Sequence, residues 1–329
     1  MLVRFKPDVT LDLIGHLTKR CETLGVQYRI LRELKTTYLI IESADSAKIT
    51  ELYHQFKHNS SVAEVILPQE TDDPLSTIPI VKIKAGNRQI GKGSRPVIIA
   101  GSPYLESGKQ AVELAARLAE LGVNVFKAGP YRPSESLPAK ILYSRTESIA
   151  KEITQKCKIP ATTMIEMLGP KAALTVEDVF AFHVPGKYMF ETGLKEQLAS
   201  IKVPVFLERH IDAETELWLD SARGIVRGGN SQVALVETGR KVDNRREIDL
   251  VGLVDLIDRI SLPVLVYPTF ASTSPRHVEK IAAASLAAGA SGVIFDVHLD
   301  PMNGLLSDGY CLSIEEFENI LKLLKDYIA

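Results

Sequence analysis

Eight short apolar, β-rich runs recur along the chain from Arg95 onward, and helical segments separate them. The runs are PVIIA (96–100), VNVFK (123–127), ATTMI (161–165), FAFHV (180–184), VPVFL (203–207), QVALV (232–236), LPVLVY (262–267) and GVIF (292–295). Continuous apolar runs are typical of strands that are buried on both faces of a parallel sheet. Eight β–α pairs over about 235 residues match the strand number and the length of a (β/α)8 TIM barrel.

The segments between these runs have helical patterns. Helices are expected at about 108–121, 138–157, 191–200, 213–226, 248–260 and 275–288, with a short one before His183 and a terminal one at 314–327. An open, doubly wound α/β sheet is the alternative, but its first strand normally leads into a G-x-G-x-x-G phosphate turn. The turn here, AGSPYLESG, lacks that spacing. We therefore predict an α/β protein whose residues 95–329 form a TIM barrel.

Residues 1–70 are predicted to form a separate, smaller domain. Its expected elements are a strand (2–5), a helix (10–24), two strands (28–34 and 37–43), a helix (44–58) and a last strand (62–68). The order β-α-β-β-α-β is that of small ferredoxin-like domains, and the size is that of amino-acid-sensing regulatory modules. A packing or oligomerisation module without a ligand fits the same order. Residues 71–94 read as a polar linker and a hairpin turning at Gly86-Asn87, which we expect to plug the bottom of the barrel.

Composition and charge exclude several classes of protein. The chain is 45% hydrophobic and 24% charged, which is ordinary for a globular protein. A formal net charge of −2 gives no basic field for nucleic acid or for an anionic membrane. No apolar run approaches the roughly 20 residues of a membrane span, and the start does not resemble a signal peptide. The cysteines Cys21, Cys157 and Cys311 are odd in number and lack metal-type spacing. We expect a cytoplasmic protein with neither nucleic-acid nor membrane partners.

Charged side chains follow the carboxyl ends of the predicted strands, where TIM-barrel enzymes build their sites. Five of them are cations: Lys127, Arg132, Lys187, Arg209 and Lys241. Their convergence in a slightly acidic chain predicts a phosphorylated or carboxylated small-molecule ligand. The alternative is a ring of ordinary ion pairs with the glutamates at the same strand ends, which are Glu106, Glu166, Glu208 and Glu237.

Eight short motifs occur in order at these strand ends. They are AGSPYLES (100–107), KAGPYRPSES (127–136), VPGKYM (184–189), LERH (207–210), ETGRK (237–241), YPTFA (267–271), DVHLDP (296–301) and SDG (307–309). Together they resemble the 3-deoxy-7-phosphoheptulonate (DAHP) synthases, in the branch shared with 3-deoxy-manno-octulosonate 8-phosphate synthase. The small N-terminal domain resembles that of regulated members of this branch. The resemblance therefore covers essentially the whole chain.

The resemblance implies a condensation of phosphoenolpyruvate with a phosphorylated aldose, usually with a divalent metal. The family's four metal ligands are a cysteine, a histidine, a glutamate and an aspartate. The matching positions here hold Pro103, Phe270, Asp296 and Asp308, and Tyr267 replaces an aspartate beside the histidine. Proline and phenylalanine carry no side-chain donor for a metal. We therefore expect no divalent metal of the family type, and we predict no other cofactor.

The same resemblance assigns the anion-binding positions. Lys127, Arg132, Lys187 and Lys241 each keep the family's positive charge while exchanging arginine for lysine or the reverse. Arginine and lysine are not interchangeable at bidentate sites, so a changed ligand geometry is expected. Glu208 stands where the family has a lysine that handles phosphoenolpyruvate. A carboxylate there could act as a general base or pair with the neighbouring arginine.

Three residues are candidates for catalysis, namely Glu208, Glu237 and His298. The last two match the family, but each could equally be a hydrogen-bonded residue behind the site. A Schiff-base lysine at Lys127 or Lys187 is conceivable, because burial among cations lowers the pKa of a lysine. Nothing in the sequence selects that chemistry.

Three functional interpretations remain open. The first is a repurposed aldolase or synthase that works without the family's metal; the second is an inactive relative that regulates or scaffolds a true DAHP synthase. The third is an ordinary synthase with an unusual metal site. The retained cations favour the first, and the lost ligands together with Glu208 disfavour the third. By resemblance, the chain is expected to form homodimers or tetramers, and a true synthase is a candidate partner.

Overall fold

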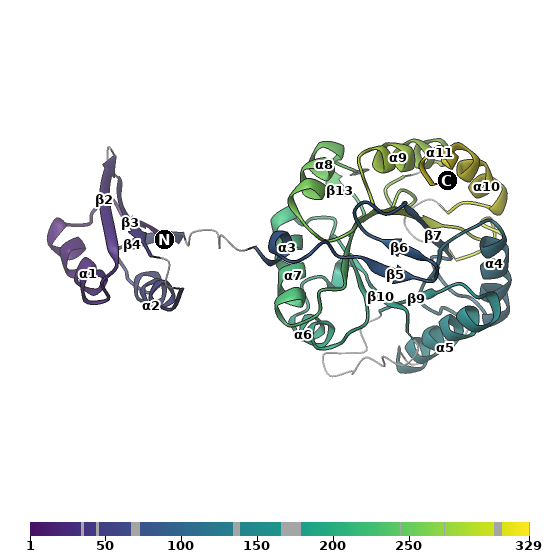
Figure 1. The fold of residues 1–329 in the computed structure, drawn as a ribbon, viewed down its shortest axis with the longest axis horizontal. Helices are drawn as coiled ribbons and strands as arrows, with labels where there is room; N and C mark the ends of the chain where they lie inside the picture. Colours follow the sequence, from purple (N-terminus) through teal and green to yellow (C-terminus); the bar gives the residue numbers. More distant parts are fainter. Residues whose placement is uncertain are drawn as a thin grey trace. The chain divides into compact units, whose positions relative to one another are not determined.

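The computed structural model describes residues 1–33, 36–43, 46–66, 73–133, 139–165, 179–243, 245–272, 274–305 and 311–328. The chain divides into two compact units, Met1–Asp73 and Pro74–Ala329, which Figure 1 shows with their elements labelled. The short helix expected before His183 lies outside the described residues.

The first unit contains a four-stranded antiparallel sheet and two helices. Its elements are β1 (Leu2–Phe5), α1 (Leu11–Thr23), β2 (Gln27–Glu33), β3 (Thr36–Glu42), α2 (Ser46–Lys57) and β4 (Val62–Ile66), with the strand order β2-β3-β1-β4. Thr10 begins α1 by accepting a hydrogen bond from the Leu13 N–H. Leu39 and Ile41 alternate with half-buried residues along β3 and pack into a core with Phe5 and Phe56. The sequence pattern predicted these six elements in this order.

A short hairpin lies between the first unit and the barrel strands. It follows α3 (Pro74–Thr77) and consists of β5 (Ile83–Ala85) and β6 (Arg88–Ile90), which pair antiparallel. Gly86 in its turn has a φ of +59°, which favours glycine. A Cβ on that glycine would lie 3.8 Å from Cδ of Pro160, just before the third barrel strand. The hairpin's buried Ile83 and Ile90 belong to the same core as the barrel, so it packs at the amino ends of the strands.

The second unit is a closed barrel of eight parallel strands, as the sequence predicted, with helices around it (Figure 1). The strands are β7 (Val97–Gly101), β8 (Val125–Ala128), β9 (Ala161–Met164), β10 (Ala181–Val184), β11 (Val205–Glu208), β12 (Val233–Glu237), β15 (Val264–Val266) and β16 (Gly292–Asp296). Each pairs in parallel with the next, and β16 closes the ring on β7. Among the described residues, no helix is long and apolar enough to cross a lipid bilayer.

The helices connect the strands and cover the barrel. They are α4 (Gly108–Glu120), α5 (Ala139–Cys157), α6 (Thr192–Ser200), α7 (Thr215–Arg227), α8 (Leu250–Arg259), α9 (Pro275–Ala287), α10 (Ile314–Leu323) and α11 (Lys325–Ile328). Side-chain caps fix several helix starts: Ser107 accepts from Gln110 at α4, and Ser313 and Glu316 form a capping box at α10. On α7, fully buried Trp218 donates from its indole N–H to the Leu207 carbonyl at 3.1 Å and so ties the helix to β11.

Gly101 at the end of β7 is required by close packing of two backbones. A Cβ at this position would lie 2.1 Å from the Lys127 carbonyl oxygen on β8. We expect Gly101→Ala to lower the free energy of unfolding by about 3 kcal/mol or to prevent folding, because the backbone must shift. Urea denaturation followed by circular dichroism measures this effect.

Gly224 supplies a matched control on the outside of the barrel. It lies within α7, and an added Cβ meets no atom within 4 Å. Gly224→Ala should leave stability unchanged or raise it by roughly 0.5–1 kcal/mol, because alanine favours the helix. Equal stabilities of the two variants would contradict this account of Gly101.

Candidate functional site

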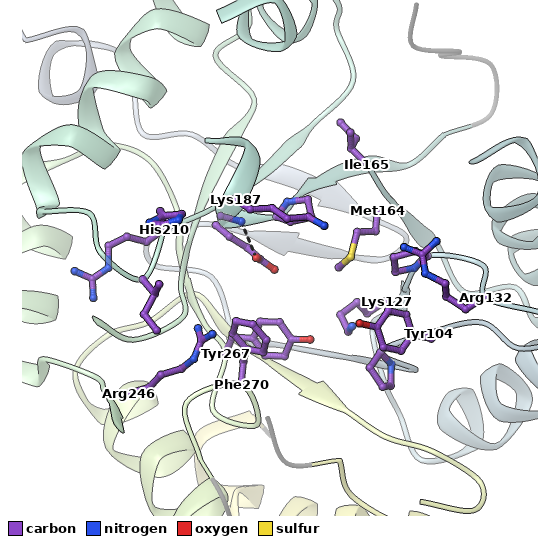
Figure 2. A pocket seen from close by; sticks show the side chains of 17 residues that line it. Tyr104, Lys127, Arg132, Met164, Ile165, Lys187, His210, Arg246, Tyr267 and Phe270 are labelled. Carbon is purple, nitrogen blue, oxygen red and sulfur yellow. Dashed lines mark hydrogen bonds between the residues drawn. The ribbon is translucent and has the colours of Figure 1, made fainter. Parts of the chain in front are cut away.

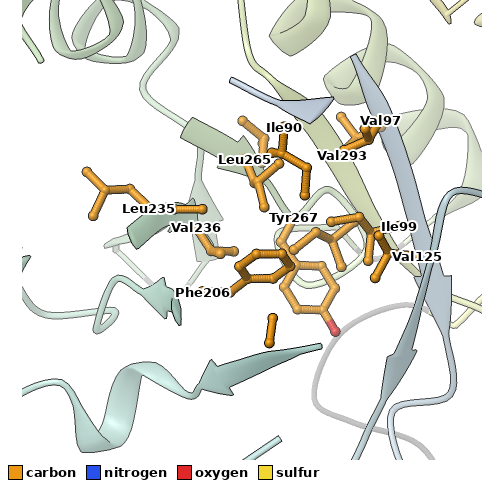
Figure 3. Packing of buried hydrophobic residues seen from close by; sticks show 14 of the residues in the cluster. Ile90, Val97, Ile99, Val125, Phe206, Leu235, Val236, Leu265, Tyr267 and Val293 are labelled. Atoms are coloured by element: carbon orange, nitrogen blue, oxygen red, sulfur yellow. The ribbon is translucent and has the colours of Figure 1, made fainter. Parts of the chain in front are cut away.

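A layer of charged side chains lies above the apolar interior of the barrel. Alternate residues of a strand point to the same face, so Lys127 follows Val125, and Asp296 follows Ile294, on one face of the sheet. Ile99 of β7 pairs with both Val125 and Ile294, so these two faces are the same one. Figure 3 shows Tyr267 among the apolar residues of this core, near Phe206. The strand register thus brings residues that end different strands into one layer.

Lys127, Asp296 and Tyr267 form a buried cluster in this layer. Lys127 Nζ lies 2.8 Å from Asp296 Oδ1, and the two side chains are 1% and 0% exposed. The Tyr267 hydroxyl donates to the same oxygen at 2.8 Å, and the Asp296 N–H donates to Thr269 Oγ1 at 2.9 Å. Gly101 lies between the two strands that carry the ion pair and has no side chain to separate them. Burial and the Asp296 charge raise the pKa of Tyr267 well above its usual value, so the phenol stays protonated.

Glu208 and His183 form a second buried pair. Glu208 Oε1 lies 2.7 Å from His183 Nε2, and Glu208 Oε2 accepts from the Gly186 N–H at 3.0 Å. Burial raises the pKa of Glu208, but the hydrogen bond and charge of His183, the Gly186 N–H and the Lys127 charge together lower it below its usual value. Glu208 is therefore held as a carboxylate at neutral pH.

Glu237 pairs with the arginine that follows Glu208. Its Oε1 lies 2.9 Å from Nη2 of Arg209 and accepts from the Gly239 N–H at 2.6 Å. Burial raises the pKa of Glu237 above its usual value, although Arg209 and the Gly239 N–H act in the opposite direction. Glu237 thus holds the guanidinium group of Arg209 in a fixed orientation.

Four of the five predicted cations line one cavity of about 310 Å3 at the carboxyl ends of the strands. They are Lys127, Arg132, Lys187 and Arg209, and Glu208 lines the same cavity. Figure 2 shows Lys127, Lys187 and Tyr267 around this space. The remaining lining residues are Pro103, Tyr104, Pro130, Met164, Ile165, Pro185, Gly186, His210, Ile211, Arg246, Tyr267 and Phe270. The cavity offers an anionic ligand several cations beside one carboxylate.

Lys241 lies outside this cavity. It belongs to the hairpin of β13 (Arg240–Val242) and β14 (Arg245–Glu247) and lines an adjoining cavity of about 800 Å3. The two cavities share Ile211, Arg246 and Phe270. In the hairpin Lys241 pairs with Arg246, and it is Arg246 that reaches the central cavity.

His298 and Glu237 also do not line the central cavity. His298 Nε2 lies 3.1 Å from Glu106 Oε1, and its Nδ1 accepts from the Asp300 N–H at 3.0 Å. Because both ring nitrogens are bonded and the side chain is 2% exposed, His298 supports the loop after β16. Of the two roles left open for His298, these contacts favour a hydrogen-bonded residue behind the site. Glu166 and Asp308 lie outside the described residues.

Sequence reasoning missed a stack of aromatic and cationic side chains at the cavity wall. The Tyr267 and Phe270 rings stack with centroids 5.4 Å apart, and the Arg246 guanidinium carbon lies 4.0 Å from the Phe270 centroid. Tyr104 also lines the cavity without having been predicted, and so does His210, the last residue of the LERH motif. The Arg245-Arg246 pair in a loop after a barrel strand was the signal for the arginine. The sequence does not show which residue of the pair lies opposite Lys241 in the hairpin; in the structure it is Arg246.

Three of the positions that the resemblance assigns to a metal are described, and their residues Pro103, Phe270 and Asp296 do not fit a divalent metal. Pro103 and Phe270 line the cavity without a donor atom, and Phe270 lies between Tyr267 and Arg246. The carboxylate of Asp296 is bonded to Lys127 and Tyr267. Within the part of the chain that the structure describes, no group of three or more histidine, cysteine, aspartate or glutamate residues could hold a metal ion.

Comparison with known proteins connects this chain to a family. Residues 77–329 match the model of the DAHP synthetase I family. The chain is 27% identical over 337 residues to the phospho-2-dehydro-3-deoxyheptonate aldolase of Thermotoga maritima, covering 99% of this chain and 97% of that protein. It is 23% identical over 292 residues to a 2-dehydro-3-deoxyphosphooctonate aldolase of Rhodopseudomonas palustris, covering 77% of this chain and 95% of that protein.

Solved structures similar to this one include two from Thermotoga maritima. The crystal structure of DAHP synthase from Thermotoga maritima has a TM-score of 0.81 at 24% identity, covering 99% of this chain and 96% of that chain. A truncated form of 3-deoxy-D-arabino-heptulosonate 7-phosphate synthase from Thermotoga maritima has a TM-score of 0.67 at 26% identity, covering 75% and 92%. With the strand-end motifs and the family match over most of its length, the chain belongs to the DAHP synthetase I family.

Proposed function

We propose that the barrel binds a phosphorylated or carboxylated small molecule of the phosphoenolpyruvate or phosphosugar class. It performs aldolase- or synthase-type carbon–carbon chemistry on this ligand without the family's metal. One observation carries the proposal: four predicted cations and Glu208 line a single cavity together with Pro103 and Phe270, which stand where the resemblance implies metal ligands. The cations bind the anionic groups, and Glu208 acts as a general base.

Two alternatives would use the same cavity differently. An inactive homologue that regulates a true DAHP synthase would bind the ligand without turnover. An ordinary DAHP synthase would turn over phosphoenolpyruvate and erythrose 4-phosphate and would depend on added metal. The buried ion pairs favour an active, altered site, because buried charges are costly and are often replaced by apolar residues without loss of stability.

The decisive experiment measures binding and turnover with and without a chelator. Isothermal titration of phosphoenolpyruvate and of erythrose 4-phosphate in EDTA should give the same Kd as titration with Mn2+ present. Condensation of the two compounds should be no faster with Mn2+ than with EDTA. Normal synthase turnover that requires Mn2+ would establish the ordinary enzyme, and binding without any chemistry would favour the regulatory homologue.

Lys187 is predicted to bind the anion directly. It lines the cavity from the η1 turn (Gly186–Tyr188), with Nζ 4.8 Å from the Tyr188 ring centroid. Lys187→Met should weaken phosphoenolpyruvate binding by about 10- to 100-fold, because a charge-assisted hydrogen bond contributes roughly 1.5–3 kcal/mol. Lys156→Met on α5 removes the same charge from a lysine outside the cavity and should leave the Kd unchanged. Equal Kd values for both variants would contradict the role of Lys187.

The N-terminal unit is proposed to be a ferredoxin-like regulatory domain of about residues 1–70, followed by a linker and plug hairpin (71–94) and the barrel (95–329). Its β-α-β-β-α-β order and the strand order β2-β3-β1-β4 support this assignment. We also propose a homodimer or tetramer, as the resemblance implies. Tyrosine or phenylalanine should then shift the melting temperature or the oligomeric state. The absence of both shifts would count against amino-acid control.

A further inference from the structure

We propose that Lys127 forms an imine with a ketone or aldehyde ligand, so that this lysine supplies the electrophilic activation of the carbonyl. The inference rests on the proposed function, because it assigns the chemistry of the same cavity. The sequence alone did not distinguish Lys127 from Lys187 as the lysine that forms an imine.

Geometry distinguishes Lys127 from the other lysine of the cavity. Lys127 lines the cavity although its side chain is only 1% exposed, and Nζ lies 2.8 Å from a fully buried carboxylate. Lys187 is exposed, and its described contact is the ring of Tyr188. A nucleophilic amine requires a base that removes its proton, and Asp296 is placed to do so. Tyr267, which donates to the same carboxylate oxygen, completes a proton-handling group around Nζ.

The electrostatics of the cluster suit the product as well as the resting ammonium group. The surroundings of Nζ stabilise a positive charge through Asp296 and through the Tyr267 ring, whose centroid lies 5.4 Å away. A protonated imine carries its positive charge on the same nitrogen. The carboxylate therefore needs no rearrangement to stabilise the iminium ion, which is the condition for preorganised catalysis.

The step balances in atoms and charge. Asp296 takes one proton from the Lys127 ammonium, and the free amine attacks the carbonyl carbon to form a carbinolamine. The proton returns to the departing hydroxyl, the C–O bond breaks, and one water molecule leaves. Ammonium plus carbonyl thus gives iminium plus water without oxidation or reduction. Lys187, Arg132 and Arg209 line the same cavity and can hold the phosphate or carboxylate of the ligand.

Glu208 is the carboxylate that lines the same cavity. The iminium withdraws electrons from the neighbouring carbon, so a carboxylate base can remove a proton there and leave a nucleophilic enamine. Its position against His183 and the Gly186 N–H keeps it ionised for that task. An enamine adding to an aldehyde is the carbon–carbon bond formation of the proposed function.

The test is reductive trapping with two ketones of the expected charge classes, pyruvate and dihydroxyacetone phosphate. The full-length protein is incubated with each compound and sodium cyanoborohydride, then digested and mapped by mass spectrometry. We expect one reduced adduct per chain on Lys127, its loss in the Lys127→Met, Asp296→Asn double variant, and its retention in Lys156→Met. The double variant removes both charges of the buried pair, so its folding is not penalised by an unpaired charge.

Each outcome separates this inference from the proposed function. Binding of either compound in titration without an adduct on Lys127 overturns the imine and leaves anion binding intact. An adduct confined to another lysine overturns the assignment of Lys127. If neither compound binds and no adduct forms, both proposals are overturned. An adduct on Lys127 that the Asp296→Asn single variant slows by at least about 10-fold at every pH supports the imine and the role of its carboxylate.

Discussion

Lys127→Met is expected to lower the free energy of unfolding by about 3–5 kcal/mol, because it leaves Asp296 as an unpaired charge in the barrel interior. The carboxylate of Asp296 is 0% exposed and has Lys127 as its partner at 2.8 Å. The Tyr267 hydroxyl and the remaining dipoles cannot replace a full positive charge. Guanidinium denaturation followed by tryptophan fluorescence is a direct readout, since Trp218 is buried against β11.

The Lys127→Met, Asp296→Asn double variant tests the cause of this effect. Removing both charges replaces a buried ion pair by a neutral pair, which is often close to neutral in stability. Most of the loss in the single variant should therefore be recovered in the double variant. A single variant within about 0.5 kcal/mol of the wild type, the size of an ordinary surface effect, would show that the ion pair does not exist.

Glu208→Gln is expected to slow proton transfer at the bound ligand by about 100- to 10,000-fold, the usual contribution of a general base. Exchange of the pyruvate methyl protons with D2O, followed by NMR, measures this step directly. Binding of phosphoenolpyruvate should persist, because the five lysine and arginine side chains that line the cavity remain and a negative charge beside them is removed. Unchanged exchange in the variant would exclude Glu208 as the base.

The same variant has a predicted pH signature in stability. The pKa of Glu208 is lowered in the folded protein, so its contribution is present above the unfolded pKa of roughly 4.3 and is lost as the pH falls through the folded value. The stability difference between wild type and Glu208→Gln should be largest above about pH 5 and shrink on acidification. A difference that grows on acidification would contradict the lowered pKa.

The alternation of strands and helices was readable from the sequence because it depends on local periodicity. All eight predicted barrel strands are present, with small differences at their ends. The predicted strand 203–207 begins at Val205 and the predicted strand 262–267 at Val264, each directly after a proline. Proline has no N–H for the ladder, so pairing starts at the next residue. The placement of polar residues at the strand ends followed from the fold class alone.

The partners of those polar residues could not be read from the sequence. Whether a cation meets a ligand or a carboxylate depends on strand register, and Lys127 and Asp296 meet because Gly101 leaves the space between them. Arg246 is the cross-strand partner of Lys241 and lines the central cavity, whereas Lys241 lines only the adjoining one. In the loop that follows β16, the His298 ring is hydrogen-bonded to Glu106 and to the Asp300 N–H.

The sequence by itself determined the TIM barrel, the family and the set of side chains from which the site is built, because hydrophobic period and motif order are properties of the chain. Only the tertiary structure decided which of them face the ligand. Contacts between residues on different strands arise when the barrel closes, and closure pairs residues by register rather than by separation along the chain. The consequence is a cavity lined by Lys127, whose charge is paired with the buried Asp296.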